Sequence, residues 1–109
     1  MSQSDPAALP APLADYFAAA DRRAIVGLFA PDARVRDEGE DHVGTAAIAR
    51  WLDRVETRYQ PRYAIQDAQT SGDHTVVTFT VSGTFPGSPT TLRQQFVLAD
   101  GRIASLATL

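Results

Sequence analysis

The 109-residue chain is predicted to fold as one α+β domain, with helices covering one face of a single, mainly antiparallel sheet. Three observations predict this class. Apolar residues recur at helical spacing in the first half, and β-branched residues with two-residue alternation dominate the second half. No repeat or change of composition marks a second domain. Residues 1–8 are expected to be a flexible N-terminus and residues 9–109 the folded domain, which is long enough to bury a core without disulfides.

Two helical segments are expected before the first strand. In the first, one apolar stripe follows the spacing i, i+4, i+7, i+8: Leu9, Leu13, Tyr16, Phe17 and Ala20. Asp21 is a suitable N-cap for the second, because its side chain can accept a hydrogen bond from a free backbone N–H. The inner face of this second segment is expected to consist of Ile25, Leu28 and Phe29.

A short strand and a third helix are expected next. Pro31 and Asp32 interrupt the helical pattern, and the apolar spacing then changes to two, which predicts a strand over residues 33–37. Residues 38–43 are expected to form a polar loop. Thr45 is expected to cap the third helix, which Pro61 should end. Its apolar face is the strongest amphipathic pattern in the sequence: Ile48, Trp51, Leu52, Val55 and Tyr59.

The second half predicts strands joined by short turns. Strands are expected over residues 63–68, 75–85 and 103–109, with another between the last two. Pro86 and Gly87 suit a type II turn, because proline fixes a negative φ and glycine accepts a positive one. Asp100 and Gly101 are typical of a hairpin turn. The residues assigned to the core-facing side are Val77, Phe79, Val81, Phe85, Leu92, Gln94, Phe96 and Leu98.

Composition argues against several classes of function. The ten basic residues, all arginine, stand against thirteen acidic ones for a net charge of −3, and this balance argues against a nucleic-acid partner. No apolar run approaches the roughly 20 residues of a membrane span, and residues 1–12 lack the apolar stretch of a secretory signal. A cytoplasmic protein is therefore expected. The acidic segment 37–42 fits no calcium-loop spacing and no phosphate loop occurs, so neither a metal nor a cofactor is predicted.

Several stretches resemble the nuclear transport factor 2-like superfamily. They are Leu28–Val35, with the sequence LFAPDARV, and Gly44–Ile48, with the sequence GTAAI. Two more, Asp37–Gly39 and Phe85–Pro89, resemble its SnoaL-like, ketosteroid isomerase-like branch of bacterial proteins. The resemblance covers the chain from about Leu9 onward. It implies a cystatin-like cone, in which three N-terminal helices pack on the concave face of a curved sheet.

The resemblance also implies a chemistry. The superfamily includes ketosteroid isomerases, polyketide cyclases, dehydratases, epoxide hydrolases and binding proteins. The isomerases and cyclases use an aspartate in an apolar cavity to remove a proton next to a carbonyl, while hydrogen-bond donors stabilise the enolate oxygen. Asp37 falls at the position of this general base. Two-residue alternation independently places Asp37 on the same face as Ala33 and Val35, toward the helices.

Two further side chains are candidate donors to the enolate oxygen. Tyr16 matches the family's oxyanion tyrosine if the connection between the first two helices is shorter here, whereas a gapless alignment places Leu13 there. Gln94 stands where the isomerases have a second acid, and its amide can also donate a hydrogen bond. The candidate substrate-binding residues, which form core or pocket wall, are Trp51, Phe79 and Phe96.

Three functions remain open from the sequence. One is an isomerase, cyclase or lyase with Asp37 as base; another is a non-catalytic pocket protein for an apolar metabolite; the third is a dimeric scaffold with a collapsed pocket. The expected partners are an apolar or carbonyl-bearing small molecule and a second copy of the chain. The homodimer would form through the convex sheet face, which carries Val76, Thr78, Thr80, Arg93, Gln95 and Val97. The sequence identifies neither substrate nor pathway.

Overall fold

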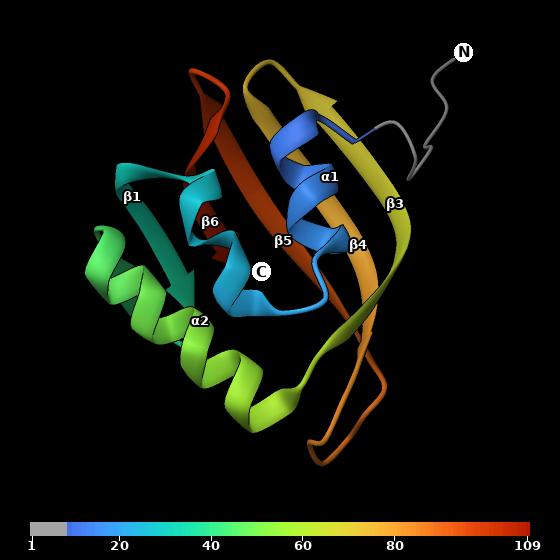
Figure 1. Cartoon of the computed structure of the whole chain (residues 1–109). Helices are drawn as coiled ribbons and strands as arrows, with labels where there is room; N and C mark the ends of the chain where they lie inside the picture. The colour runs from blue at the N-terminus through green and yellow to red at the C-terminus, as the bar shows by residue number, and fades with distance from the viewer. Residues whose placement is uncertain (1–8) are drawn as a thin grey trace.

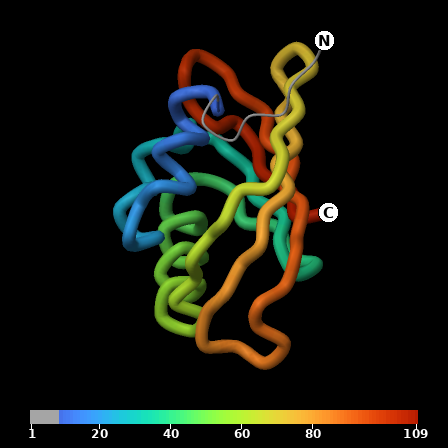
Figure 2. Tube along the Cα trace, turned by 90° about the vertical axis from the view of Figure 1, so that its right-hand side faces the viewer, coloured from blue at the N-terminus to red at the C-terminus, as the bar shows by residue number. Residues whose placement is uncertain are grey.

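The fold has two layers, with helices on one side and a curved six-stranded sheet on the other (Figures 1 and 2). A computed structural model describes residues 9–109, so the flexible N-terminus expected over residues 1–8 lies outside the described residues. The elements in order are α1 (Ala11–Ala18), the 3₁₀-helix η2 (Arg22–Leu28), β1 (Phe29–Asp37), β2 (Glu40–Val43), α2 (Thr45–Tyr59), β3 (Arg62–Ser71), β4 (His74–Ser82), β5 (Thr90–Ala99) and β6 (Arg102–Thr108). The predicted α+β class is confirmed.

The helical elements form largely where the sequence predicts them. Asp21 is the N-cap of η2, and its Oδ1 accepts a hydrogen bond from the backbone N–H of Arg23 at 2.8 Å. Two details differ. The N-cap of α2 is Gly44, whose φ of 87° suits glycine, and not Thr45. In addition, the expected three N-terminal helices are not exactly matched, because the second is a 3₁₀-helix of seven residues that ends at Leu28. Phe29, expected on its inner face, is the first residue of β1.

The polar loop expected over residues 38–43 is wrong, because most of it is a strand. Glu38 and Gly39 form a tight turn with φ of 52° and 77°, and β2 then returns antiparallel along β1. Positive φ at both central residues matches the twist of a two-residue hairpin. As an edge strand, β2 is short and mostly exposed, so it carries no apolar alternation that would reveal it.

The strands form one mixed sheet in the order β2-β1-β6-β5-β4-β3. The pair β1–β6 is parallel and every other neighbouring pair is antiparallel. Both predicted turns are confirmed: Gly87 has φ of 87°, and Asp100 and Gly101 have φ of 53° and 76°. Trp51, Phe79 and Phe96 are all buried in the same core between the layers, as the assigned faces require.

The helices cover the concave face unevenly. The first part of the chain, α1 with η2, lies over the middle of the sheet, and α2 packs on η2, β1 and β2 (Figure 1). The C-terminal half of α2 therefore faces β4 and β5 across a gap that side chains only partly fill. Within residues 9–109, no helix combines the length and apolar character that a membrane crossing requires.

Candidate functional site

A cavity of about 420 Å³ opens between α2 and the concave face of the sheet. This volume suits a small organic molecule. Its wall is mainly apolar and aromatic, with polar groups at separate places. The lining residues are Tyr16, Arg22, Asp37, Glu38, Trp51, Leu52, Val55, Tyr59, Pro61, Tyr63, Phe79, Val81, Phe85, Pro86, Thr90, Leu92 and Gln94.

Asp37 is the carboxylate at the inner wall of this cavity. It is the last residue of β1, on the same face as the buried Ala33 and Val35, and it is half-buried. The indole Nε1–H of Trp51 donates a hydrogen bond to its Oδ2 at 3.1 Å. Among the described side chains, none donates to Oδ1. The arrangement holds the carboxylate in place and leaves one oxygen able to accept a proton.

Trp51 is itself fixed by β2. The imidazole of His42 stacks on the indole ring, with centroids 6.0 Å apart and planes 27° apart. Sequence reasoning assigned Trp51 to the cavity wall, which it does line, but missed its hydrogen bond to Asp37. The two residues lie on different elements, so no spacing along the chain indicates that they meet.

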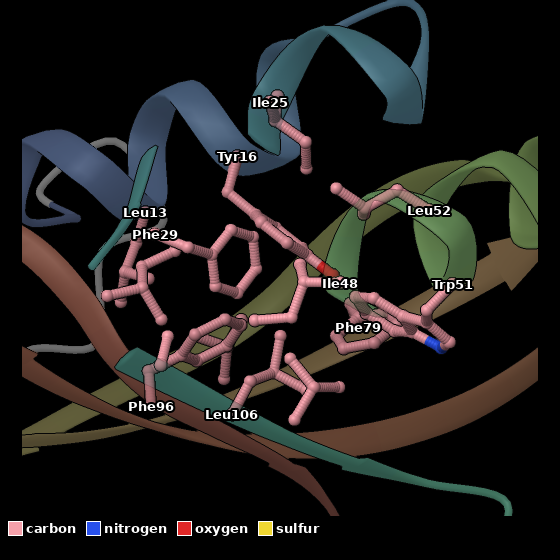
Figure 3. Close-up of a cluster of buried hydrophobic side chains, with 14 of the residues drawn as sticks. Leu13, Tyr16, Ile25, Phe29, Ile48, Trp51, Leu52, Phe79, Phe96 and Leu106 are labelled. Atoms are coloured by element: carbon pink, nitrogen blue, oxygen red, sulfur yellow. The ribbon is translucent and has the colours of Figure 1, made fainter. Parts of the chain in front are cut away.

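Tyr16 and Tyr63 are two tyrosines that line the same cavity. Burial raises the pKa of Tyr16 well above its ordinary value, and the nearby charge of Asp37 acts in the same direction. Burial raises the pKa of Tyr63 to about 12. Figure 3 shows the Tyr16 ring reaching from α1 across the core, with its oxygen turned toward Trp51 and Phe79. Both hydroxyls therefore stay protonated at neutral pH and can donate hydrogen bonds.

Gln94 lies in the wall with only 7% of its surface exposed. Its Nε2 donates to Oγ1 of Thr108 at 3.1 Å, and its Oε1 is buried without a hydrogen-bond partner among the described residues. The amide therefore directs its donor toward β6. A buried carbonyl oxygen without a hydrogen-bond donor costs free energy of folding. Oε1 of Gln94 is therefore an acceptor in the cavity wall that the described residues leave unpaired.

The two candidate aromatic residues on the strands lie in different places. Phe79 lines the cavity, as expected for a substrate contact. Phe96 does not; it is fully buried and packs edge-on against Tyr16, with centroids 5.4 Å apart. Phe96 shares the inner face of β5 with Gln94 but lies at the closed end of the concave face, as Leu13 does, so its role as a substrate contact stays a prediction. Tyr16, and not Leu13, reaches the cavity.

The cavity mouth is lined by residues from three connections. The Tyr59 hydroxyl donates to the Glu38 carboxylate at 3.3 Å, which joins the end of α2 to the β1–β2 turn. The Tyr59 ring meets Phe85 edge-on at 5.7 Å. The backbone N–H of Thr84 donates to the carbonyl of Tyr59 at 2.8 Å, which ties the β4–β5 loop to α2. These contacts fix the shape of the opening.

Sequence reasoning missed Arg22 entirely. Its side chain lines the cavity and is 1% exposed, with the guanidinium carbon 5.0 Å from the Tyr16 ring centroid and 4.8 Å from that of Tyr63. A charged residue directly after an N-cap is usually exposed, so neither composition nor spacing indicated its burial.

In the described part of the chain, no group of three possible ligand side chains is arranged to hold a metal ion.

Comparison with known proteins identifies the family. The family model described as the SnoaL-like domain matches residues 13–106 of this chain. The chain therefore belongs to the SnoaL-like domain family. Among curated proteins, no significant match is found.

Solved structures agree with this membership. A candidate polyketide cyclase from Sinorhizobium meliloti is 39% identical, with a TM-score of 0.89, and the match covers 96% of this chain and 99% of that one. A Catenulispora acidiphila protein with a ketosteroid isomerase-like fold, solved with trimethylamine, is 21% identical, with a TM-score of 0.74 and coverage of 91% and 82%. A cystatin-fold protein from Novosphingobium aromaticivorans is 20% identical, with a TM-score of 0.72 and coverage of 99% of both chains. The last two show the fold alone.

Proposed function

We propose that this SnoaL-like domain binds a carbonyl-bearing small molecule in its cavity and that Asp37 removes a proton from the carbon next to the carbonyl. One observation carries the proposal: the Asp37 carboxylate, held by Trp51, stands in the wall of a mainly apolar cavity of about 420 Å³. The similarity to a candidate polyketide cyclase supports the same class of chemistry.

The proposed step is proton transfer. The C–H bond next to the carbonyl breaks, its proton passes to Oδ1 of Asp37, and its electron pair forms an enolate whose charge lies on oxygen. In an isomerase or cofactor-independent cyclase, Asp37 then returns this proton. In an isomerase the proton goes to another carbon of the enolate. In a cyclase the enolate carbon first attacks a second carbonyl, and the proton then goes to the new alkoxide oxygen. Each sequence returns the carboxylate to its starting state.

The two tyrosine hydroxyls suit the developing negative charge. Tyr16 and Tyr63 are neutral near pH 7, as tyrosine ordinarily is, and burial raises the pKa of both groups further. A donor held in place, as the enclosed Tyr16 hydroxyl is, stabilises developing charge without the reorganisation that water would need. Gln94 contributes a donor only if its side-chain amide rotates by half a turn, so that Nε2 and Oε1 exchange places. Oε1, which is now unpaired, would then lie next to Oγ1 of Thr108.

The test is base-catalysed exchange of hydrogen for deuterium. Stable aryl ketones with enolisable protons, such as propiophenone, tetralone and β-benzoylpropionate, are incubated with the protein in deuterium oxide and followed by NMR. We expect saturable exchange for at least one of them. Asp37→Asn should lower the rate by roughly 10²–10⁴, the usual contribution of one general base.

The matched control is Asp41→Asn. Asp41 lies on the neighbouring strand β2 in an exposed ion pair with Arg36 at 3.0 Å, so the same chemical change there should leave exchange unaltered. Equal rates for wild type and Asp37→Asn on a ketone that the protein turns over would disprove the role of Asp37. Saturable binding without exchange would favour the second candidate, a binding protein. That function also fits the hydrogen bonds that Asp37 accepts from Trp51 and that Gln94 donates to Thr108, because both groups are already engaged within the protein.

The homodimer stays a prediction. The residues named for it on β4 and β5 lie in the sheet on the face opposite the buried Val77 and Phe79, and most of them are half-buried. We propose that this convex face pairs with a second copy, leaving the cavity on the other face open to its ligand.

A further inference from the structure

Arg22 is a buried cation in the cavity wall with unfinished hydrogen bonding. Nη2 donates to the carbonyl of Ala19 at 2.9 Å, whereas Nη1 is inaccessible and has no hydrogen-bond partner among the described residues. The guanidinium lies between the rings of Tyr16 and Tyr63, at 5.0 and 4.8 Å from their centroids. The two rings hold the cation through cation–π attraction but offer no negative charge.

The charge of Arg22 is not matched within residues 9–109. No described Asp or Glu forms an ion pair with its guanidinium, and Glu56 accepts a hydrogen bond only from the Arg22 backbone N–H, at 2.7 Å. The next residue, Arg23, is the opposite case: it is exposed and bound by both oxygens of Asp21. Arginine does not lose its proton in proteins, so a buried guanidinium without a carboxylate keeps a large desolvation cost. An anion entering the cavity would offset that cost.

We propose that the ligand of this cavity is a carbonyl compound that also carries a carboxylate, and that Arg22 binds the carboxylate. The carbonyl part of this inference rests on the proposed function, whereas the carboxylate part does not. A planar guanidinium and a carboxylate match in geometry, and their hydrogen bonds are stronger than those between neutral groups. The anion completes the hydrogen bonding of Nη1, a buried donor atom of the cavity wall that has no partner among the described residues.

The charges of the wall orient this ligand. Asp37 and Glu38 are the acidic lining residues, and they repel a carboxylate, so its anionic end lies at Arg22 and its ketone faces Asp37. Nη1 is covered, so binding requires one neighbour to move. Tyr63 is half-buried on the edge strand β3, whereas Tyr16 is enclosed, so we assign this movement to the Tyr63 ring.

Fluorescence of Trp51 tests the proposal, because this sole tryptophan lines the cavity. β-Benzoylpropionate and its neutral methyl ester differ in charge but share the same ketone. We expect the acid to bind wild-type protein roughly 10- to 100-fold more tightly than the ester, as expected for hydrogen bonds to a charged group. Arg22→Met should remove this preference by weakening the acid alone.

Arg23→Met is the matched control, and it should keep the preference for the acid. Asp37→Asn should also keep it, so a failure of the proposed base chemistry leaves this result intact. Thermal unfolding shows whether Arg22→Met folds; if it does not, the acid and ester compared on wild type decide alone. Equal affinities of acid and ester, no saturable binding of the acid, or a preserved preference in folded Arg22→Met would each overturn the inference.

Discussion

The concave face of the sheet has a filled end and a hollow end. At the filled end, side chains from α1, β1, β5 and β6 interlock and exclude water: Leu13, Phe29, Phe96 and Leu106. At the hollow end, α2, β3, β4 and β5 enclose the cavity, and Arg22 of η2 and Asp37 of β1 complete its wall. Figure 3 shows Tyr16 between them, with its ring beside Phe29 and its hydroxyl toward Trp51. The same strands run through both ends, so one sheet supplies the stability at one end and the binding site at the other.

A pair of leucines gives the largest expected contrast between the two ends. Leu106 is 1% exposed at the filled end, so Leu106→Ala should lower the free energy of unfolding by about 2–5 kcal/mol, as buried leucines do when a cavity is left behind. Leu92 lines the existing cavity and is half-buried. Leu92→Ala should cost less stability and should weaken ligand binding instead. Urea unfolding and Trp51 fluorescence measure the two effects, and equal losses of stability would remove the distinction between the ends.

Gly83 tests what keeps the hollow end open. A Cβ at this position would lie 2.1 Å from the carbonyl oxygen of Tyr59, which is backbone and cannot move alone. Gly83→Ala should therefore push the β4–β5 loop away from α2, cost about 1–3 kcal/mol in unfolding free energy, and lower ligand affinity.

The control is Gly27→Ala in η2, where none of residues 9–109 beyond its chain neighbours and its own helix backbone lies within 4 Å of the added carbon. Calorimetry should show little change in its unfolding temperature. A Gly83→Ala protein with wild-type stability and affinity would mean that this close approach does not define the cavity mouth.

The smallest expected effect is a displaced tyrosine titration. Burial is the main cause of the raised pKa of all three tyrosines, Tyr16, Tyr59 and Tyr63, the last to about 12. Their contribution to stability is therefore complete below the ordinary pKa of 10.0 and is lost as the pH rises toward 12 and above. Ultraviolet absorbance should show fewer than half of the tyrosines ionised at pH 10, compared with half in urea. Coincident titration curves would contradict the enclosure of Tyr16 and Tyr63.

Much of this architecture follows from local patterns in the sequence. Alternation alone places Asp37 beside Val35 on the inner face, and it buries Phe79 because one face of β4 must cover the core. Asp21 caps a helix, and Asp100 with Gly101 turns a hairpin, because each requirement lies within a few residues. Features of this kind can be predicted from neighbouring residues, because they do not depend on contacts with distant segments of the chain.

The features that sequence reasoning missed depend on contacts between distant segments. The strand β2 pairs at an edge and buries little, so no periodicity marks it. Arg22 is buried because Tyr16 and Tyr63 enclose it, from α1 and from β3. Phe96 and Gln94 share a face of β5, yet only Gln94 reaches the cavity, because the helices above leave the gap over one end only.

The most direct test of the account follows the single indole N–H signal of Trp51 by two-dimensional NMR while β-benzoylpropionate is added. This group donates to Asp37 in the cavity wall, whereas the backbone N–H of Ile103 reports on the filled end. The account predicts a saturable shift of the indole signal at ligand concentrations that leave the Ile103 amide signal in place. Saturable binding that moves the Ile103 signal and leaves the indole signal unchanged would contradict it, because the ligand would then occupy a different part of the molecule.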